Sequence, residues 1–144
     1  MDQVLNSFFV YGTLRPGETR WHALEPYVIG NPMPATLSNV EMYNVGGSYP
    51  CILKAESGEV TGEVVMVKPE DTQRVLRLLD NIEGYIENSP QRSLFLREVV
   101  QPRLNIVIEG VDASAEVEAW AYFGGSSFTS DTLRRIDSGN WKQR

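Results

Sequence analysis

Short apolar runs separated by turn residues recur along most of the chain, and they predict a protein built mainly from β-strands. The first run, Phe8-Phe9-Val10-Tyr11, is apolar at consecutive positions, which is typical of a strand buried on both faces. Glycine, proline and asparagine lie between the runs and mark the turns. We expect strands at residues 7–11, 35–43, 51–54, 60–67, 94–100, 105–108 and 116–123.

One helix is predicted, beginning at Pro69 and capped by Gly84, because proline suits a first helical turn and glycine suits the residue after the last one. Leu76 and Leu79 belong to its apolar stripe. Glu83 continues that stripe at the i, i+3, i+7 spacing, so its carboxylate shares the packing face. Glu83 should therefore be partly buried.

No low-complexity stretch, repeat or linker divides the chain, so we expect a single domain over residues 1–144. A length of 144 residues is enough to bury a core without disulfides or metals. The polar stretch 109–114 lies between two apolar runs and predicts a long mobile hairpin loop.

The turn that follows the first strand is a candidate anion site. Gly12 can adopt dihedral angles closed to other residues, so the N–H groups of Gly12, Thr13 and Leu14 can converge on one point. The alternative is that these residues only reverse the chain at the end of a strand.

Glu83 is the candidate acid–base group. Burial disfavours the charged form of a carboxyl group, which moves its pKa toward neutral pH, where it can accept and donate protons. Two alternatives stay open: Glu83 is a solvated or ion-paired residue, or Asp80, three residues earlier, is the inward carboxylate or orients Glu83.

Other catalytic centres have little support in the composition. A single histidine, His22, and a single cysteine, Cys51, cannot form a zinc site alone, and no carboxylate cluster has metal-ligand spacing. The glycine-rich stretches match no nucleotide-binding fingerprint. A thiol hydrolase that pairs Cys51 with His22 is a weaker alternative, because a cysteine that opens an apolar run usually packs inertly.

Charge and hydropathy exclude several classes of partner. The net charge is −6 and the basic residues are scattered, which argues against nucleic acid. The longest apolar runs are strand-sized and too short to cross a membrane. We see no secretory signal, and one cysteine cannot form an intramolecular disulfide, so we expect a cytoplasmic protein.

Six motifs occur in the order found in γ-glutamylcyclotransferase-like proteins, and the resemblance covers nearly the whole chain. The motifs are Tyr11-Gly12-Thr13-Leu14, Ser48-Tyr49-Pro50, Thr61-Gly62-Glu63-Val64, Leu79-Asp80-Asn81-Ile82-Glu83-Gly84-Tyr85, Ala119-Trp120-Ala121-Tyr122-Phe123 and Ser138-Gly139-Asn140-Trp141. The resemblance implies an α+β fold, a small mixed β-barrel with flanking short helices. It also implies a cavity at the Tyr-Gly-Thr-Leu turn and a catalytic glutamate at Glu83.

The resemblance further implies a reaction in which the α-amine of a γ-glutamyl group attacks its own γ-carbonyl, forming 5-oxoproline and releasing an amine. This reaction needs no cofactor, and its partner is a small γ-glutamyl substrate. The N–H groups of Gly12, Thr13 and Leu14 would hold the γ-carbonyl oxygen or the α-carboxylate. Tyr11, Tyr49 and Tyr122 would form the wall of the cavity, although aromatic residues at strand ends are also common in cores.

Two departures from the family pattern bear on the substrate. Members that act on glutathione or γ-glutamyl amino acids tend to carry Tyr-Gly-Ser-Asn-Leu, whereas Thr13-Leu14 resembles the subgroup described for γ-glutamylamines. Phe95 replaces a tyrosine often found before the arginine matched by Arg97. The alternative to an enzyme is a non-catalytic module that uses the cavity to bind a small acid or another protein.

Turnover should survive both metal chelators and thiol-blocking reagents, because the sequence offers neither a metal-ligand cluster nor an activated cysteine. The measurement is 5-oxoproline release before and after treatment with EDTA or iodoacetamide. Activity that disappears on chelation and returns with one added metal would contradict this mechanism.

Overall fold

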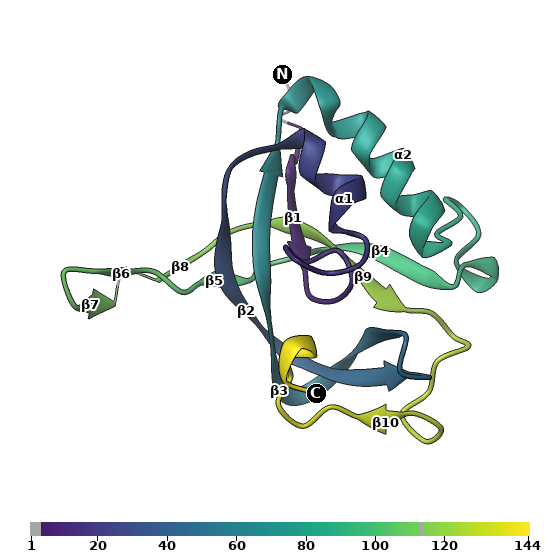
Figure 1. Cartoon of the computed structure of the whole chain (residues 1–144). Coiled ribbons are helices and arrows are strands. Elements are labelled where there is room, and N and C mark those ends of the chain that lie inside the picture. The colour runs from purple at the N-terminus through teal and green to yellow at the C-terminus, as the bar shows by residue number, and fades with distance from the viewer. Residues whose placement is uncertain (1–3, 113) are drawn as a thin grey trace.

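An eight-stranded mixed sheet forms the body of the protein in the computed structural model, which describes residues 4–112 and 114–144. The strand order is β4-β9-β1-β3-β2-β5-β8, and β10 pairs with β2. The sheet curls into a half-barrel flanked by two helices, which confirms the predicted α+β fold (Figure 1). The main elements are β1 (Ser7–Val10), α1 (Trp21–Leu24), β2 (Val28–Val45), β3 (Tyr49–Val67), α2 (Thr72–Glu83), β4 (Phe95–Val100), β5 (Arg103–Leu104), β6 (Val107–Ile108), β7 (Val111–Asp112), β8 (Ala115–Glu116), β9 (Ala119–Gly124) and β10 (Arg134–Arg135).

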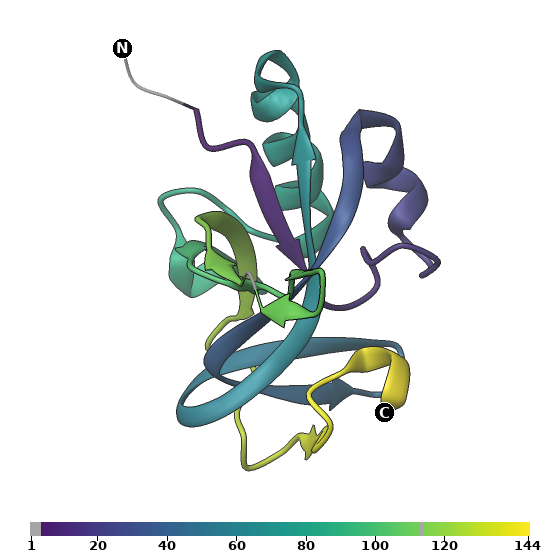
Figure 2. The ribbon, with the colours of Figure 1, turned by 90° about the vertical axis from the view of Figure 1, so that its left-hand side faces the viewer.

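The antiparallel hairpin of β2 and β3 produces the curl, and both strands bend along their length (Figure 2). Asn39 has a φ of 62° at a register shift in β2, and Gly58 opposite it has a φ of +118°. A Cβ atom on Gly58 would lie 2.5 Å from the carbonyl oxygen of Val40. The expectation of two separate strands at 51–54 and 60–67 is therefore wrong, because Gly58 bends a continuous strand instead of ending it.

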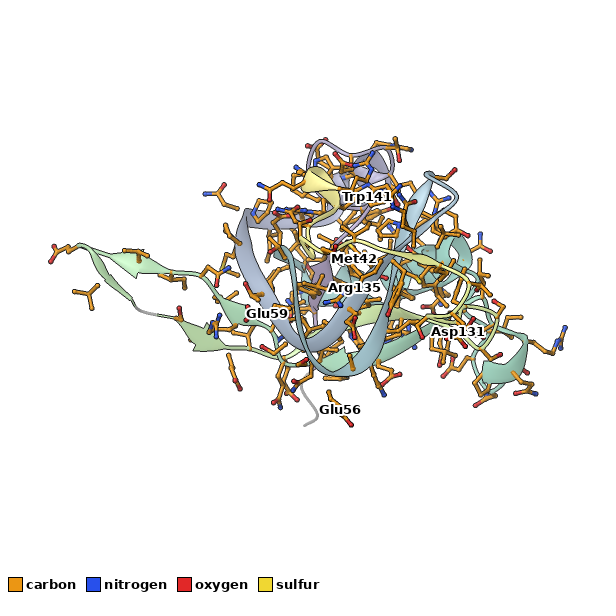
Figure 3. The ribbon with its side chains drawn as sticks, turned by 90° about the horizontal axis from the view of Figure 1, so that it is seen from below. Met42, Glu56, Glu59, Asp131, Arg135 and Trp141 are labelled. Atoms are coloured by element: carbon orange, nitrogen blue, oxygen red, sulfur yellow. The ribbon has the colours of Figure 1, made fainter. Side chains whose placement is uncertain are left out.

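Strand β1 is buried on both faces, as the unbroken apolar run predicts. Phe8 and Val10 belong to a cluster that packs under α2, whereas Phe9 and Tyr11 belong to a second cluster inside the curl. All four side chains are at most 7% exposed. The second cluster also holds Met42 and Trp141, which lie over the middle of the molecule in Figure 3, while Glu56 points away from it.

The predicted helix is present, with a short 3-10 turn at Pro69–Asp71 leading into α2. Gly84 ends it in the left-handed conformation with a φ of 71°, as expected for a C-cap glycine. Leu76 and Leu79 are buried against the sheet. The helix is thereby held with its last turn over the end of β1.

The segment between β5 and β8 extends away from the body as a narrow arm (Figure 1). The strand expected at 105–108 is reduced to β6, and two residues of the loop expected at 109–114 instead form β7, which pairs with β6 to make a hairpin. Glu109 and Gly110 form the turn with φ angles of 51° and 79°, which suits a two-residue hairpin. Residue 113 of the expected loop lies outside the described residues.

One smaller correction concerns a strand that was expected in one piece. The strand expected at 116–123 is divided into β8 and β9, whereas β4 falls within the expected 94–100. In the described part of the chain, none of the helices has the length and apolarity needed to cross a membrane.

Candidate active site

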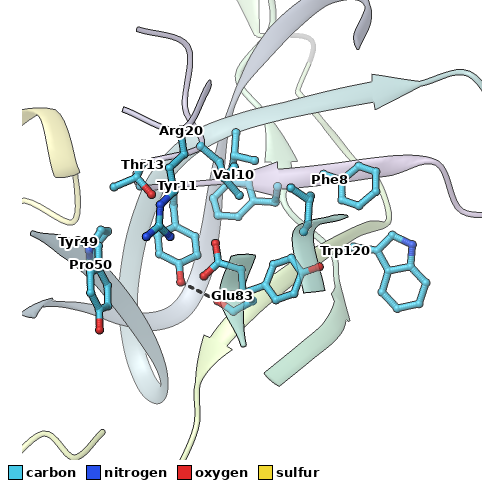
Figure 4. A pocket seen from close by; sticks show the side chains of 14 residues that line it. Phe8, Val10, Tyr11, Thr13, Arg20, Tyr49, Pro50, Glu83 and Trp120 are labelled. Atoms are coloured by element: carbon cyan, nitrogen blue, oxygen red, sulfur yellow. Dashed lines mark hydrogen bonds between the residues drawn. The ribbon is translucent and has the colours of Figure 1, made fainter. Parts of the chain in front are cut away.

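A pocket lies where the turn after β1 meets the start of β3, strand β9 and the last turn of α2 (Figure 4). It encloses about 470 Å³ of space free of protein atoms, the open mouth included. All of the site residues named from the sequence line it: Tyr11, Gly12, Thr13, Leu14, Tyr49, Glu83 and Tyr122. The structure thus brings these residues together, and their roles in binding and catalysis stay predictions.

Sequence reasoning missed other lining residues, among them Arg20, Pro50 and Trp120. Pro50 follows Tyr49 in a matched motif, and Trp120 lies two residues before Tyr122, so both could have been found from the expected strands. Arg20 carried no such signal. It reaches the pocket because its backbone N–H donates a 2.8 Å hydrogen bond to the carbonyl oxygen of Thr13, which folds the loop back.

Gly12 is required for a different reason than its dihedral freedom. Its φ is not positive, so the expectation of a conformation closed to other residues is wrong. A Cβ atom at this position would lie 2.6 Å from Cγ of Pro50, which is too close for any side chain. Gly12 therefore lets two walls of the pocket approach each other.

The N–H groups of Gly12, Thr13 and Leu14 donate no hydrogen bond to the described residues outside the strand ladders. The turn itself is closed by the N–H of Arg15, which donates to the carbonyl oxygen of Gly12 at 3.0 Å. Buried backbone donors normally have an acceptor, so these three groups are suited to an anionic or carbonyl oxygen of a ligand.

A buried ion pair holds the turn in place. The Nε and Nη2 atoms of Arg15 donate to the two carboxylate oxygens of Glu63, each at 2.8 Å, and Nη1 donates to Oδ1 of Asn140 at 2.7 Å. Arg15 is only 4% exposed. This paired geometry joins the turn to β3 and to the C-terminal segment at once, and it leaves none of the three guanidinium nitrogens without an acceptor.

Glu83 is half-buried, and its carboxylate points into the pocket (Figure 4). Burial raises its pKa from an ordinary 4.5 to about 7, and the positive charge of Arg20 opposes that rise. The carboxyl group is thus present in both protonation states near neutral pH. A group with that property can accept a proton in one step and donate it in the next.

Asp80 is not the inward carboxylate. Its Oδ1 accepts a 2.6 Å hydrogen bond from the hydroxyl of Tyr122, and Oδ2 pairs with Nη1 of Arg97 at 2.9 Å. The guanidinium of Arg97 in turn lies 4.8 Å from the centre of the Trp120 ring. Asp80 therefore fixes the wall of the pocket, while the carboxylate of Glu83 is left for a ligand.

Two tyrosines of the wall, Tyr11 and Tyr122, are held by hydrogen bonds. The hydroxyl of Tyr11 donates to the backbone carbonyl oxygen of Tyr122 at 2.6 Å, and burial raises its pKa well above the ordinary value. Burial also raises the pKa of Tyr122, and its hydrogen bond to Asp80 adds to the rise. Both phenols consequently stay neutral near pH 7 and form a rigid wall.

The structure disfavours the thiol alternative. Cys51 has no exposed surface, and burial raises its pKa to about 12, so the thiolate needed for nucleophilic attack is scarce. His22 is exposed, and its Nδ1 atom lies 3.1 Å from the carbonyl oxygen of Thr19.

Comparison with known proteins places the chain in a family. Residues 8–143 match the sequence profile of the family described as gamma-glutamyl cyclotransferase, AIG2-like. The chain belongs to this AIG2-like family. No curated protein sequence matches it with statistical significance.

Solved structures agree with the AIG2-like fold. A Mus musculus AIG2-like protein is 20% identical with a TM-score of 0.67, covering 92% of this chain and 86% of its own. An Arabidopsis thaliana protein is 26% identical with a TM-score of 0.65, and the match covers 98% of this chain and 83% of the Arabidopsis chain. A protein named gamma-glutamyl cyclotransferase is 16% identical with a TM-score of 0.59, and the match covers 92% of this chain and 70% of that protein's chain.

Replacing Gly12 by valine should abolish the binding of 5-oxoproline that the sequence resemblance implies, because the new side chain collides with Pro50 at the pocket. Overpacking of this kind costs about 1–3 kcal/mol, so the melting temperature should also fall. Calorimetric titration of the folded variant is the measurement. Binding equal to that of the parent would mean that the ligand site lies elsewhere.

Replacing Glu83 by glutamine should stabilise the AIG2-like protein at pH 8 and have little effect at pH 4.5. The folded-state pKa of about 7 lies above the ordinary 4.5, so the free energy of unfolding falls as pH rises through that window. The variant removes the charge of the half-buried carboxylate, so its free energy of unfolding at pH 8 should rise by an amount on the order of 2 kcal/mol.

Denaturant unfolding at both pH values measures this effect, and Glu56→Gln on the exposed surface is the matched control. Equal stability of parent and Glu83→Gln at pH 8 would show that burial does not raise the pKa of Glu83.

Proposed function

We propose that this AIG2-like protein is a γ-glutamylcyclotransferase that converts a small γ-glutamyl amine or amide to 5-oxoproline and a free amine. The observation that carries the proposal is the position of Glu83, a carboxyl group with a pKa of about 7. It lies in the same pocket as three backbone N–H groups for which the described residues supply no acceptor outside the strand ladders. Family membership supports the class of reaction.

The proposed chemistry needs one proton-transfer group. The neutral α-amine attacks the γ-carbonyl carbon, and a new carbon–nitrogen bond closes the five-membered ring. The excess proton on that nitrogen passes to the carboxylate of Glu83. Glu83 then gives the proton to the leaving nitrogen as the original amide bond breaks, so the carboxylate is regenerated and no cofactor takes part.

The turn after β1 would stabilise the negative charge that develops on the γ-carbonyl oxygen. The N–H groups of Gly12, Thr13 and Leu14 are already oriented by the Arg15 ion pair, so little reorganisation is needed during the reaction. Attack within one molecule is fast once the chain is bent, and the closely spaced walls at Gly12 and Pro50 favour that bent form.

A panel of γ-glutamyl amines, amides and amino acids, with 5-oxoproline detected by mass spectrometry, tests the proposal. Turnover of any member supports it. Tight binding of 5-oxoproline without turnover of any member would instead indicate a module that binds small acids.

Replacing Glu83 by glutamine should leave the protein folded but reduce turnover about 10²- to 10⁴-fold, which corresponds to roughly 3–5 kcal/mol of transition-state stabilisation. The amide has the same size as the carboxyl group but cannot accept the proton. The measurement is kcat on a substrate found in the panel.

Asp80→Asn is the matched control, because the amide oxygen can still accept the hydrogen bond from Tyr122. Asp80→Asn should lower kcat much less than Glu83→Gln does. The roles would have to be exchanged if Asp80→Asn were inactive while Glu83→Gln kept turnover near that of the parent.

A further inference from the structure

The side chain of Arg20 is not explained by the chemistry proposed above. Its side chain is half-buried and lines the pocket, yet within residues 4–112 and 114–144 it makes no hydrogen bond or ion pair with another side chain. The hydrogen bonds that hold this residue in the fold come from its backbone, whose N–H donates to Thr13 and whose carbonyl oxygen accepts from Ala23. A partly desolvated cation without a counter-ion is costly unless a ligand supplies one.

Arg20 faces Glu83 across the pocket (Figure 4). The two do not form an ion pair, although the positive charge of Arg20 lowers the pKa of Glu83 against the effect of burial. The hydroxyls of Tyr11 and Tyr122 also approach Glu83, but both are neutral and already donate to other acceptors. Among the described lining residues, Arg20 and Glu83 are therefore the two charged side chains, one of each sign.

This pair of charges matches the head of an amino acid. The α-amine and the α-carboxylate of a γ-glutamyl group are attached to the same carbon atom. An amine placed against Glu83 for proton transfer therefore brings the carboxylate close to the opposite, positive side of the pocket. The planar guanidinium fork pairs with a carboxylate through two parallel hydrogen bonds.

We infer that Arg20 is a specificity-determining residue that binds the α-carboxylate of the substrate and thereby selects γ-glutamyl compounds whose α-carboxylate is free. This inference rests on the proposed function. It assigns the α-carboxylate to Arg20 and leaves the backbone N–H groups of the turn for the γ-carbonyl oxygen. A substrate whose γ-glutamyl residue continues into a peptide through its α-carboxyl group is then a poor ligand.

Binding of two small probes tests the inference without turnover. The probes are 5-oxoproline, which has a carboxylate, and 5-oxoprolinamide, in which an amide replaces it. We expect Arg20→Gln to weaken binding of 5-oxoproline about 10- to 100-fold and to leave the amide nearly unchanged. The affinity of Arg20→Lys for 5-oxoproline should lie between those of the parent and Arg20→Gln, because lysine keeps the positive charge but cannot form two parallel hydrogen bonds.

Arg74→Gln is the matched control, since it makes the same change in net charge on the exposed face of α2. It should not alter the preference for acid over amide. Thermal unfolding of each variant shows whether it is folded. An unchanged preference in folded Arg20→Gln would overturn the inference.

Turnover separates this inference from the proposed function. A γ-glutamyl alkylamine has only the α-carboxylate, whereas a γ-glutamyl amino acid has a second carboxylate on its leaving group. We expect Arg20→Gln to lower kcat/KM for both by a similar factor. A loss confined to the γ-glutamyl amino acid would mean that Arg20 recognises the leaving group, which would overturn the inference while the proposed function stands. No turnover of any compound, with no binding of 5-oxoproline, would refute both.

Discussion

Burial of β1 on both faces is the constraint on which the rest of the structure depends. Phe8 and Val10 need cover from α2, and Phe9 and Tyr11 need cover from inside the curl, so the strand has to lie in the middle of the sheet. Strand β1 runs directly into the turn at Gly12. The pocket lies between this turn, the start of β3, strand β9 and the last turn of α2.

The site combines several features that are unfavourable for folding alone. Among the described residues, the half-buried carboxyl group of Glu83 and the guanidinium of Arg20 have no ion-pair partner. The N–H groups of the turn have no acceptor there outside the strand ladders. The ion pair of Arg15 with Glu63 compensates locally, because it fixes the turn with well-oriented hydrogen bonds. The groups that line the pocket lower the stability of the fold, and the hydrogen bonds of Arg15 beside the pocket raise it.

Much of this arrangement could be predicted from the sequence where the signal is local. The apolar run before Gly12, the helix from Pro69 to Gly84 and the partly buried position of Glu83 follow from residue spacing, and the structure confirms them. The continuity of β3 could not be predicted, because Gly58 looks like a turn until its partner at Asn39 is known. The place of Arg20 depends on how a loop folds back, which is a matter of tertiary contacts. The domain count, the cytoplasmic location and the roles of the site residues stay predictions.

The bond between Arg15 and Asn140 also has a consequence for how the protein is made. It joins residues that are 125 positions apart, and Trp141 next to Asn140 fills the cluster inside the curl. The turn that holds Arg15 therefore lacks this contact in a nascent chain until Asn140 has been synthesised and has left the ribosome. A nascent chain that stops before Asn140 would contain the residues of β1 and α2 but would lack one of the contacts that fix the turn beside the pocket.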